Sequence, residues 1–125
     1  MKTIILVILS VFMVGCVSNV VNLATNQRDK TYNDVMQSKV AMSEFNLISS
    51  WGAPDKSYTF ANGSKMISYE SSWDVGMGSA YCIQKFIIEN EKVTKWGIEG
   101  DCLNKSTRTG DKLPSNTPIP RPTLN

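Results

Sequence analysis

The sequence contains no histidine, so its carboxylates and its three cysteines are the first side chains to consider for chemistry. Without histidine, neither a Ser-His-Asp triad nor a Cys-His pair can form, and the usual general base is missing. The segment Gly76-Met77-Gly78 lacks the Gly-Lys-Ser/Thr ending of a phosphate loop and does not lead into a predicted helix. Seven carboxylates fall on predicted loops and strand ends, at spacings that do not indicate a glycosidase pair: Asp55, Glu70, Asp74, Glu89, Glu91, Glu99 and Asp101. The sequence therefore predicts a protein that is not an enzyme and that uses no cofactor or metal.

Residues 1–15 have the pattern of a secretory signal peptide. Lys2 supplies a positive charge, and an almost unbroken apolar run follows from Ile4 to Val14. A helix that spans a bilayer needs roughly 20 apolar residues, so the run is short for an uncleaved membrane anchor, which is the alternative. We therefore expect this segment to be removed on export.

Cys16 ends the segment Met13-Val14-Gly15-Cys16, which resembles the bacterial lipobox. In a lipobox the cysteine is lipidated and becomes the first residue of the mature lipoprotein. The resemblance implies a diacylglycerol and an N-acyl chain such as palmitate on Cys16, and several acyl chains anchor a protein stably where one binds only marginally. Because Val17 follows the cysteine, in place of the aspartate that marks inner-membrane retention, we expect the outer membrane, with the body of the protein in the periplasm.

Cys82 and Cys102 remain as a pair once Cys16 is assigned to the lipid. In the oxidising periplasm, two such cysteines in a small secreted domain are more often a disulfide bond than two thiols. The bridge would close a loop of about 20 residues, which the chain-entropy model values at about 3 kcal/mol. A metal site is disfavoured because the chain offers no histidine and no further thiol.

Composition and charge limit the number of domains and the kind of partner. From Cys16 onward the chain has the length of one domain with a single hydrophobic core. The formal net charge of the whole sequence is only +2, with both signs interspersed, so nothing favours nucleic acid as a partner.

The sequence divides into four segments: the signal peptide over 1–15, a tether over 16–30, a folded domain over 31–102 and a tail over 103–125. The tether is rich in asparagine, which is typical of a flexible linker between lipid and domain. The tail is rich in proline and small polar residues, so it cannot bury enough apolar surface to fold alone, and we expect it to be disordered. Docking of its Pro-Ile-Pro-Arg-Pro stretch as a polyproline helix is the alternative.

Two short helices are predicted at the start of the folded domain. Thr31 is a possible N-cap for a helix over 32–40. Ser43 is a plausible N-cap for a second helix, whose apolar face would include Phe45, Ile48 and Trp51. This helix should end at Trp51 or Gly52, because glycine suits a helix C-terminus and a proline follows shortly after.

Strand patterns fill the rest of the domain. Asn62-Gly63 is a strong signal for a two-residue hairpin turn, and one face of this hairpin should pack against the two helices. With a two-residue turn at Asn90-Glu91, Cys82 would lie opposite Glu99, so a disulfide with Cys102 needs a bulge or a curl after Gly100. The predicted strands cover 57–60, 65–69, 81–88 and 93–98, with a loop over 71–80.

The order of these elements resembles the SmpA/OmlA (BamE-like) group of small bacterial lipoproteins, in an uncharacterised branch with a C-terminal cysteine pair. The resemblance implies an α+β fold with two short N-terminal helices packed on one face of an antiparallel sheet of three or four strands. BamE itself, an accessory of the outer-membrane protein assembly machine, lacks the cysteine pair. The resemblance is carried by Trp51-Gly52-Ala53-Pro54, Tyr58 to Gly63, Ile67-Ser68-Tyr69, Cys82 to Phe86, Val93, Trp96 and Gly100-Asp101-Cys102.

These observations predict an outer-membrane-anchored lipoprotein that binds or scaffolds an envelope protein and has no evident small-molecule substrate. The alternative is a periplasmic inhibitor or exclusion factor that blocks an enzyme or a receptor. The candidate partner surface is Trp73, which is either buried under its loop or exposed for a partner, together with the hairpin tip at Asn62 and Gly63.

Overall fold

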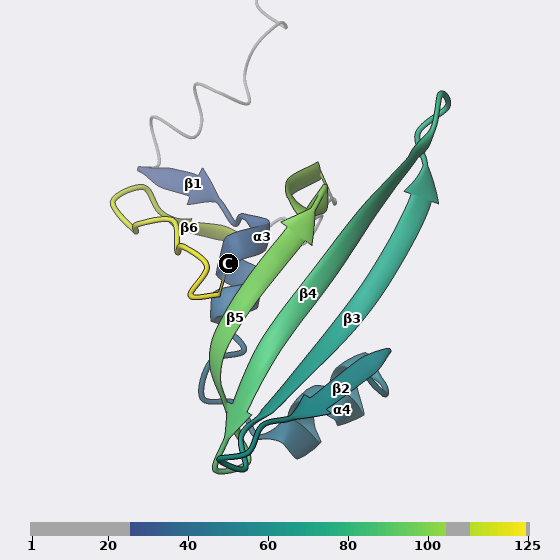
Figure 1. The fold of residues 1–125 in the computed structure, drawn as a ribbon. Helices are drawn as coiled ribbons and strands as arrows, with labels where there is room; N and C mark the ends of the chain where they lie inside the picture. Colours follow the sequence, from purple (N-terminus) through teal and green to yellow (C-terminus); the bar gives the residue numbers. More distant parts are fainter. Residues whose placement is uncertain (1–25, 105–110, 125) are drawn as a thin grey trace, which may run out of the picture. The chain divides into compact units, whose positions relative to one another are not determined.

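A computed structural model describes residues 26–104 and 111–124 of the chain (Figure 1). The predicted signal peptide, Cys16 and most of the tether lie outside the described residues. The described part forms two compact units, one made of 26–29 with 112–117 and the other of 30–104, 111 and 118–124.

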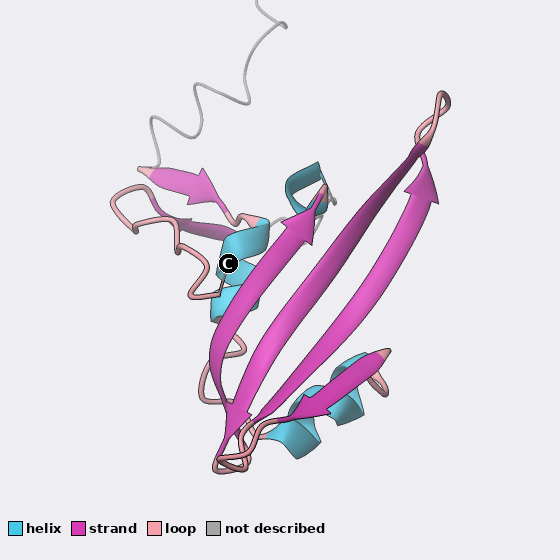
Figure 2. Cartoon of the chain, viewed as in Figure 1, coloured by secondary structure: helices cyan, strands magenta, loops and turns pink. Residues whose placement is uncertain are grey.

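The larger unit contains two helices and a four-stranded antiparallel sheet, so the predicted α+β class is confirmed. The strands lie in the sheet in the order β2-β3-β4-β5, and Figure 2 shows both helices on the same side of this sheet. The helices are not N-terminal, because a strand, β1 (Gln27–Asp29), precedes them. The other elements are α3 (Tyr32–Gln37), α4 (Glu44–Trp51), β2 (Lys56–Thr59), β3 (Lys65–Asp74), β4 (Ser79–Glu89), β5 (Lys92–Gly100), the 3₁₀ helix η1 (Cys102–Asn104) and β6 (Lys112–Pro114).

Both helices begin at the N-caps that the sequence predicts. The Thr31 amide donates to the Asp34 carboxylate at 2.7 Å, and the Asp34 amide donates to the Thr31 hydroxyl at 3.4 Å, which forms a capping box. The Ser43 hydroxyl accepts the Asn46 amide at 3.1 Å. Each cap satisfies backbone N–H groups that have no partner inside the helix.

The two helices end for different reasons. Helix α4 ends at Trp51 as predicted, since Gly52 takes a positive φ of 89° that only glycine adopts readily. Helix α3 is shorter than the predicted 32–40, because the chain turns away to pair with the start of β5. There the Ala41 amide donates to the Val93 carbonyl at 2.8 Å, and the Val93 amide donates to the Met42 carbonyl at 2.9 Å.

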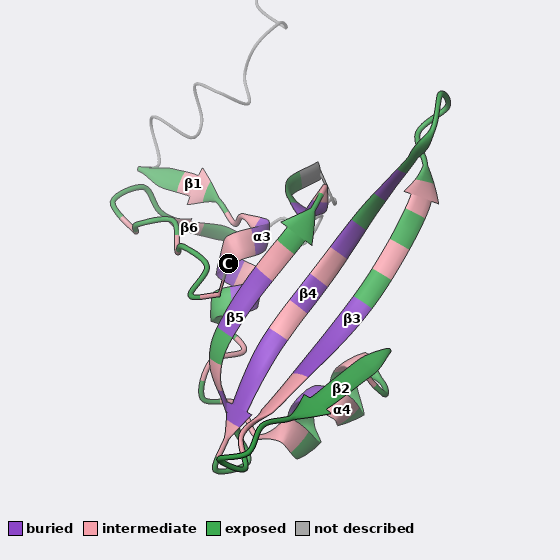
Figure 3. Ribbon diagram, in the orientation of Figure 1, coloured by how far each residue is buried: buried purple, intermediate pink, exposed green. Residues whose placement is uncertain are grey.

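The hydrophobic core lies between the helices and one face of the sheet (Figure 3). Met36 of α3 and Leu47 of α4 are fully buried in one cluster with Ile67, Phe86 and Trp96. Burying a side chain of this size contributes roughly 1.5–3 kcal/mol, so these contacts hold the helices on the sheet.

The aromatic side chains of β2 and the turn after it lie on the face of the sheet away from the helices. Ser57 lies opposite Ile67 in the register, so Ser57 points to the core face and Tyr58 to the uncovered face. Tyr58 and Phe60 are exposed and meet edge to face, with ring centroids 5.0 Å apart. Ile67 and Tyr69 of β3 both point to the core face, where both are buried.

Two connections differ from their predicted form. The turn at Asn62-Gly63 is one residue longer than expected. The Phe60 amide donates to the Ser64 carbonyl at 2.8 Å, the Gly63 amide donates to the Phe60 carbonyl at 3.0 Å, and Gly63 takes a φ of 86°. The predicted loop over 71–80 is mostly strand, because β3 and β4 continue their ladder to Asp74 and Ser79. Serine and glycine have low β-propensity, so the pairing rather than the local sequence extends these strands.

A bulge between Ile87 and Ile88 sets the register of β4 and β5. The two-residue turn at Asn90-Glu91 is present, but the bulge moves Cys82 opposite Gly100 instead of Glu99. The chain then curls into η1, which brings Cys102 to Cys82 with their Cα atoms 4.7 Å apart in a disulfide. The Cys82–Cys102 bridge is therefore present, and the chain uses both a bulge and a curl where the sequence predicted one or the other.

Segment 118–124 of the predicted disordered tail is placed against the sheet. The Trp96 carbonyl of β5 accepts the amides of Thr123 and Leu124 at 2.9 and 3.0 Å, and the Trp96 amide donates to the Thr123 hydroxyl at 2.9 Å. The Pro120 carbonyl accepts the side-chain amide of Asn33 at 2.9 Å. The expectation of disorder is wrong for this segment, because the outer edge of β5 supplies the hydrogen bonds that its own composition cannot.

The smaller unit pairs the tether with the tail. Strands β1 and β6 form a two-stranded antiparallel sheet in which Arg28 lies opposite Leu113. Inside this unit the Arg28 guanidinium donates to the Thr117 carbonyl at 2.9 Å. These strands fall within the segments predicted to be a flexible tether and a disordered tail, so the prediction is wrong for 27–29 and 112–114.

No helix among the described residues is both long and apolar enough to cross a membrane.

One polar pair is buried beneath α3. The side-chain amide of Gln84 donates to the hydroxyl of Tyr32, and both residues are buried. Burial raises the pKa of Tyr32 above its ordinary value, and the bond from Gln84 opposes this rise only in part. Folding therefore favours the neutral phenol.

This shift predicts how stability depends on alkaline pH. Unfolded tyrosine ionises near pH 10, whereas folded Tyr32 holds its proton to higher pH, so the free energy of unfolding should fall as the pH rises above about 10. Tyr32→Phe should weaken this dependence, as measured by urea unfolding between about pH 8 and pH 11. Tyr58→Phe, at an exposed tyrosine, is the control. Parallel curves for wild type and Tyr32→Phe would contradict the assignment.

A second prediction concerns segment 118–124. A Cβ atom on Gly97 would lie 2.8 Å from both the Cβ and the carbonyl oxygen of Leu124, so Gly97→Ala should displace this segment from β5. We expect faster amide hydrogen exchange at Thr123 and Leu124 and a loss of about 1 kcal/mol in stability. Lys95→Ala, at an exposed neighbour on the same strand, should leave both unchanged. If the amides of Thr123 and Leu124 in Gly97→Ala exchange as slowly as in the wild type, the contact of Gly97 with Leu124 is not needed to hold segment 118–124 on β5.

Candidate functional site

The outer parts of β3 and β4 form a two-stranded ribbon, residues 72–81, that continues beyond the end of β5. Cys82 pairs with Gly100, the last residue of β5, so residues before Cys82 have no strand on that side. On the other side, β2 pairs with β3 only as far as Ser68. Figure 1 shows this ribbon extending past its neighbours. The ribbon is the most prominent candidate for contact with a partner.

Exposed apolar side chains lie at the tip of the ribbon. The Val75 amide donates to the Gly78 carbonyl at 3.0 Å and closes the turn. Met77 is fully exposed and Val75 is 59% exposed. Two glycines with positive φ, Gly76 and Gly78, leave this turn without further side chains, so Met77 and Val75 are its contact groups.

Trp73 lies on β3 rather than under a loop. It is half-buried and packs against the core cluster, on the same face as Tyr69. Its indole therefore supports the ribbon from the core side and offers a partner only its remaining surface. Neither of the two predicted placements, under a loop or free for a partner, describes it fully.

The base of the ribbon is held on the β4 side. The Asp101 amide donates to the Tyr81 carbonyl at 2.7 Å, and the Asp101 carboxylate accepts the Tyr81 amide at 3.3 Å. The Tyr81 ring lies over Gly100, where any Cβ would approach it to 2.7 Å. Together with the disulfide between Cys82 and Cys102, these contacts fix the direction in which the ribbon leaves the sheet.

The structure separates the residues of the predicted partner surface. Asn62 and Gly63 lie in the turn before Lys65, at the opposite end of β3 from Trp73. At about 3.3 Å per strand residue, this distance is on the order of 25 Å or more. The turn shares a polar pocket of about 520 Å³ with the β4–β5 turn, lined by Asn62, Gly63, Ser64, Glu89, Asn90 and Glu91. The three predicted residues therefore do not form one surface.

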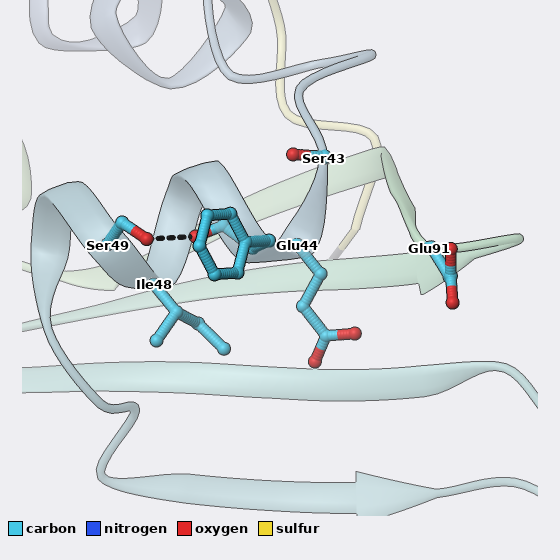
Figure 4. A pocket seen from close by; sticks show the side chains of 6 residues that line it. Ser43, Glu44, Ile48, Ser49 and Glu91 are labelled. Carbon is cyan, nitrogen blue, oxygen red and sulfur yellow. Dashed lines mark hydrogen bonds between the residues drawn. The ribbon is translucent and has the colours of Figure 1, made fainter.

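Another pocket, of about 380 Å³, lies beside the first turn of α4 (Figure 4). Phe45, which was expected on the buried face of the helix, is 78% exposed there, while Leu47 takes the core position. The Glu44 amide donates to the Glu91 carbonyl at 2.8 Å, and the Glu44 carboxylate pairs with Lys65 at 2.6 Å. The pocket therefore combines a phenyl ring with a carboxylate that is held in an ion pair.

The uncovered face of the sheet carries two cross-strand ion pairs. Lys56 pairs with Glu70 at 2.6 Å and Lys85 pairs with Glu99 at 2.7 Å, beside the exposed ring of Tyr58. The hydrogen bond and the charge of Glu70 raise the pKa of Lys56. Lys56 therefore remains charged at neutral pH and is not a candidate nucleophile.

A cleft of about 520 Å³ lies on the core face of the sheet. It is lined by residues of both helices, of the segment after α4 and of β3 and β4: Tyr32, Val35, Trp51, Ala53, Asp55, Tyr69, Glu70, Ser71 and Gln84. The Tyr69 hydroxyl donates to the Gly52 carbonyl at 2.9 Å, and burial raises the pKa of Tyr69. A phenol held neutral in this way is a poor base. The cleft therefore presents two phenols that burial keeps neutral, those of Tyr32 and Tyr69.

The residues that the sequence did not point to are Met77 at the tip of the ribbon and Asp101 at its base. Each falls in or beside a stretch that was predicted to be a loop or a strand end. The apolar residues Val75 and Met77, separated by one glycine, were the available signal for an exposed turn between strands.

Among the described residues, no group of three histidine, cysteine, aspartate or glutamate side chains is arranged to hold a metal ion. Cys16 lies outside the described residues, so its lipidation remains a prediction. Compared with models of protein families, with curated proteins and with solved structures, the chain matches none.

Proposed function

We propose that this protein is a non-enzymatic binding module that holds another envelope protein, tethered to the outer membrane by a lipid on Cys16. The observation that carries the binding role is the ribbon over 72–81. It places exposed apolar side chains beyond the end of β5, on a base held by Asp101 and a disulfide.

The chemistry of the ribbon suits recognition of a protein. Met77 and Val75 offer flexible and branched apolar contacts that a pocket on a partner can bury. A base fixed by hydrogen bonds and a covalent bridge reduces the conformational entropy that binding would otherwise cost. The ribbon therefore presents a small apolar contact in a defined direction.

The sequence supplies the support for the proposed location. A charged start, a short apolar run and a lipobox-like segment ending at Cys16 together favour export and lipidation. The two helices on one face of an antiparallel sheet are the arrangement that likeness to the BamE-like group implies, and this agreement supports a distant relation to that group. We do not extend the proposal to the assembly role of BamE, because the cysteine pair departs from it.

Photo-crosslinking in intact Gram-negative cells tests the binding role. A photoreactive residue in place of Met77 should give a crosslink to a discrete envelope protein, because this side chain is fully exposed at the tip. The matched control replaces Lys95, which is exposed on β5 away from the ribbon. Absence of any crosslink from Met77 and Val75, or the same products from Lys95, would contradict a role for the tip of the ribbon.

The proposed tether has its own test. Cys16→Ser should abolish incorporation of labelled palmitate and remove the protein from the outer-membrane fraction, because serine offers no thiol for the diacylglycerol. Cys102→Ser is the control for loss of a cysteine elsewhere and should still be lipidated. If Cys16→Ser protein keeps its label and its membrane fraction, the assignment of the lipid to Cys16 is wrong.

A further inference from the structure

The edge of β3 is open where the ribbon begins. Strand β2 pairs with β3 from Lys65 to Ser68, and Asp55 then continues the contact. The Asp55 amide donates to the Ser68 carbonyl at 2.9 Å, and the Asp55 carboxylate accepts the Glu70 amide at 2.7 Å. Backbone groups on one side of a strand recur at every second residue, so the N–H and C=O groups of Ser72 point to this same edge.

Parts of two other strand edges, on β5 and on β4, are covered by the chain itself. On β5, Ala41 and Met42 bond to Val93, and segment 118–124 bonds to Trp96. On β4, Asp101 bonds to Tyr81 at the base of the ribbon. Within the described residues, no other segment forms a hydrogen bond with the outward N–H and C=O groups of Ser72. An uncovered strand edge of this kind is a template for pairing with another extended chain.

Carboxylates follow this edge. Asp55, Glu70 and Asp74 lie along it, and of the three only Glu70 has an ion pair among the described residues, with Lys56 at 2.6 Å. In the ladder, Glu70, Ser72 and Asp74 share the uncovered face of the sheet. The edge therefore keeps a net negative charge, which a pairing strand must match.

This charge pattern disfavours a second copy of the chain. Antiparallel pairing of two β3 edges about Ser72 would place Glu70 of one copy opposite Asp74 of the other. Like charges directly opposite one another destabilise a strand pair. Basic side chains at these two positions would stabilise it instead.

A pocket lies beside the same edge, on the uncovered face. It has a volume of about 320 Å³ and is lined by Glu70, Ser71, Ser72, Tyr81 and Ile83. Tyr81 is opposite Ser72 in the register, and Ile83 is opposite Glu70. Because Ser72 is small, a side chain opposite it on an added strand would reach this space and meet the ring of Tyr81.

We propose that the edge of β3 at Ser72 to Asp74 binds an extended basic segment of the partner protein by strand addition. The segment would carry lysine or arginine opposite Glu70 and Asp74, with an apolar residue between them opposite Ser72. The backbone bonds give affinity, and the alternate side chains give specificity. This inference rests on the proposed binding function and names the chemistry of its partner.

A peptide probe tests strand addition directly. We expect the purified full chain to bind a short threonine-rich peptide with lysine, phenylalanine and lysine at alternate positions, as measured by fluorescence anisotropy. Ser72→Pro removes the outward N–H and should weaken binding by about tenfold or more. Proline is tolerated where a strand N–H faces outward, so the fold should survive. Ser72→Ala keeps the N–H and is the matched control, with unchanged affinity expected.

The charge argument has a separate test that does not depend on proline. A peptide with glutamates in place of both lysines should bind wild type about tenfold more weakly or worse. Asp74→Lys should weaken binding of the lysine peptide and strengthen binding of the glutamate peptide. Equal affinities for the two peptides, or wild-type affinity in Ser72→Pro, would overturn the inference.

The failures of the two proposals can be told apart. If a crosslink from Met77 captures an envelope protein but the lysine peptide does not bind, strand addition is wrong and the binding role stands. If the peptide binds with the expected Ser72→Pro loss but Met77 gives no crosslink, strand addition stands and the contact at the tip is wrong. If the chain alone dimerises in sedimentation and Ser72→Pro abolishes the dimer, a second copy is the occupant and the basic segment is overturned.

Discussion

The antiparallel pairing of β3 with β4 runs from Lys65 opposite Ile88 to Asp74 opposite Ser79, and the other contacts of the larger unit are built on it. This ladder turns Ile67 and Phe86 toward the helices. It also sets the position of β2 on one side and of β5 on the other. Because neither neighbour is as long as the central pair, the same ladder that organises the core also produces the ribbon.

The strand edges of the sheet differ in whether other segments of the chain cover them. Exposed strand edges invite unwanted pairing, and folded proteins usually cover them with other segments or with charge. Here β5 is covered by backbone bonds from two separate segments, and β4 ends under Asp101. At the edge of β3, the Asp55 carboxylate accepts the Glu70 amide. Among the described residues, this is the last hydrogen bond that the chain makes to this edge before Ser72. The open edge beyond it is short and anionic, a combination that limits self-association.

The sequence predicted much of the local structure correctly. Thr31 and Ser43 cap the helices, Gly52 ends the second one, and Cys82 meets Cys102. Each of these depends on side chains close in sequence or on the redox chemistry of two thiols. The candidate surface was less well predicted, because Trp73 packs partly on the core and lies at the far end of β3 from Asn62. Proximity of such residues depends on strand length, and the serine- and glycine-rich stretch after Tyr69 contained no local signal for a long strand.

What the sequence determined by itself was therefore what short-range physics controls: helix caps, turn residues, the apolar run before Cys16 and the absence of histidine chemistry. The tertiary structure alone decided the length of the ribbon, the exposure of Phe45 and the placement of segment 118–124 on β5. Each of these is a long-range effect. A strand continues where a partner strand offers backbone bonds, a helix face is buried only where another surface covers it, and a proline-rich segment is ordered where an open edge accepts its amides.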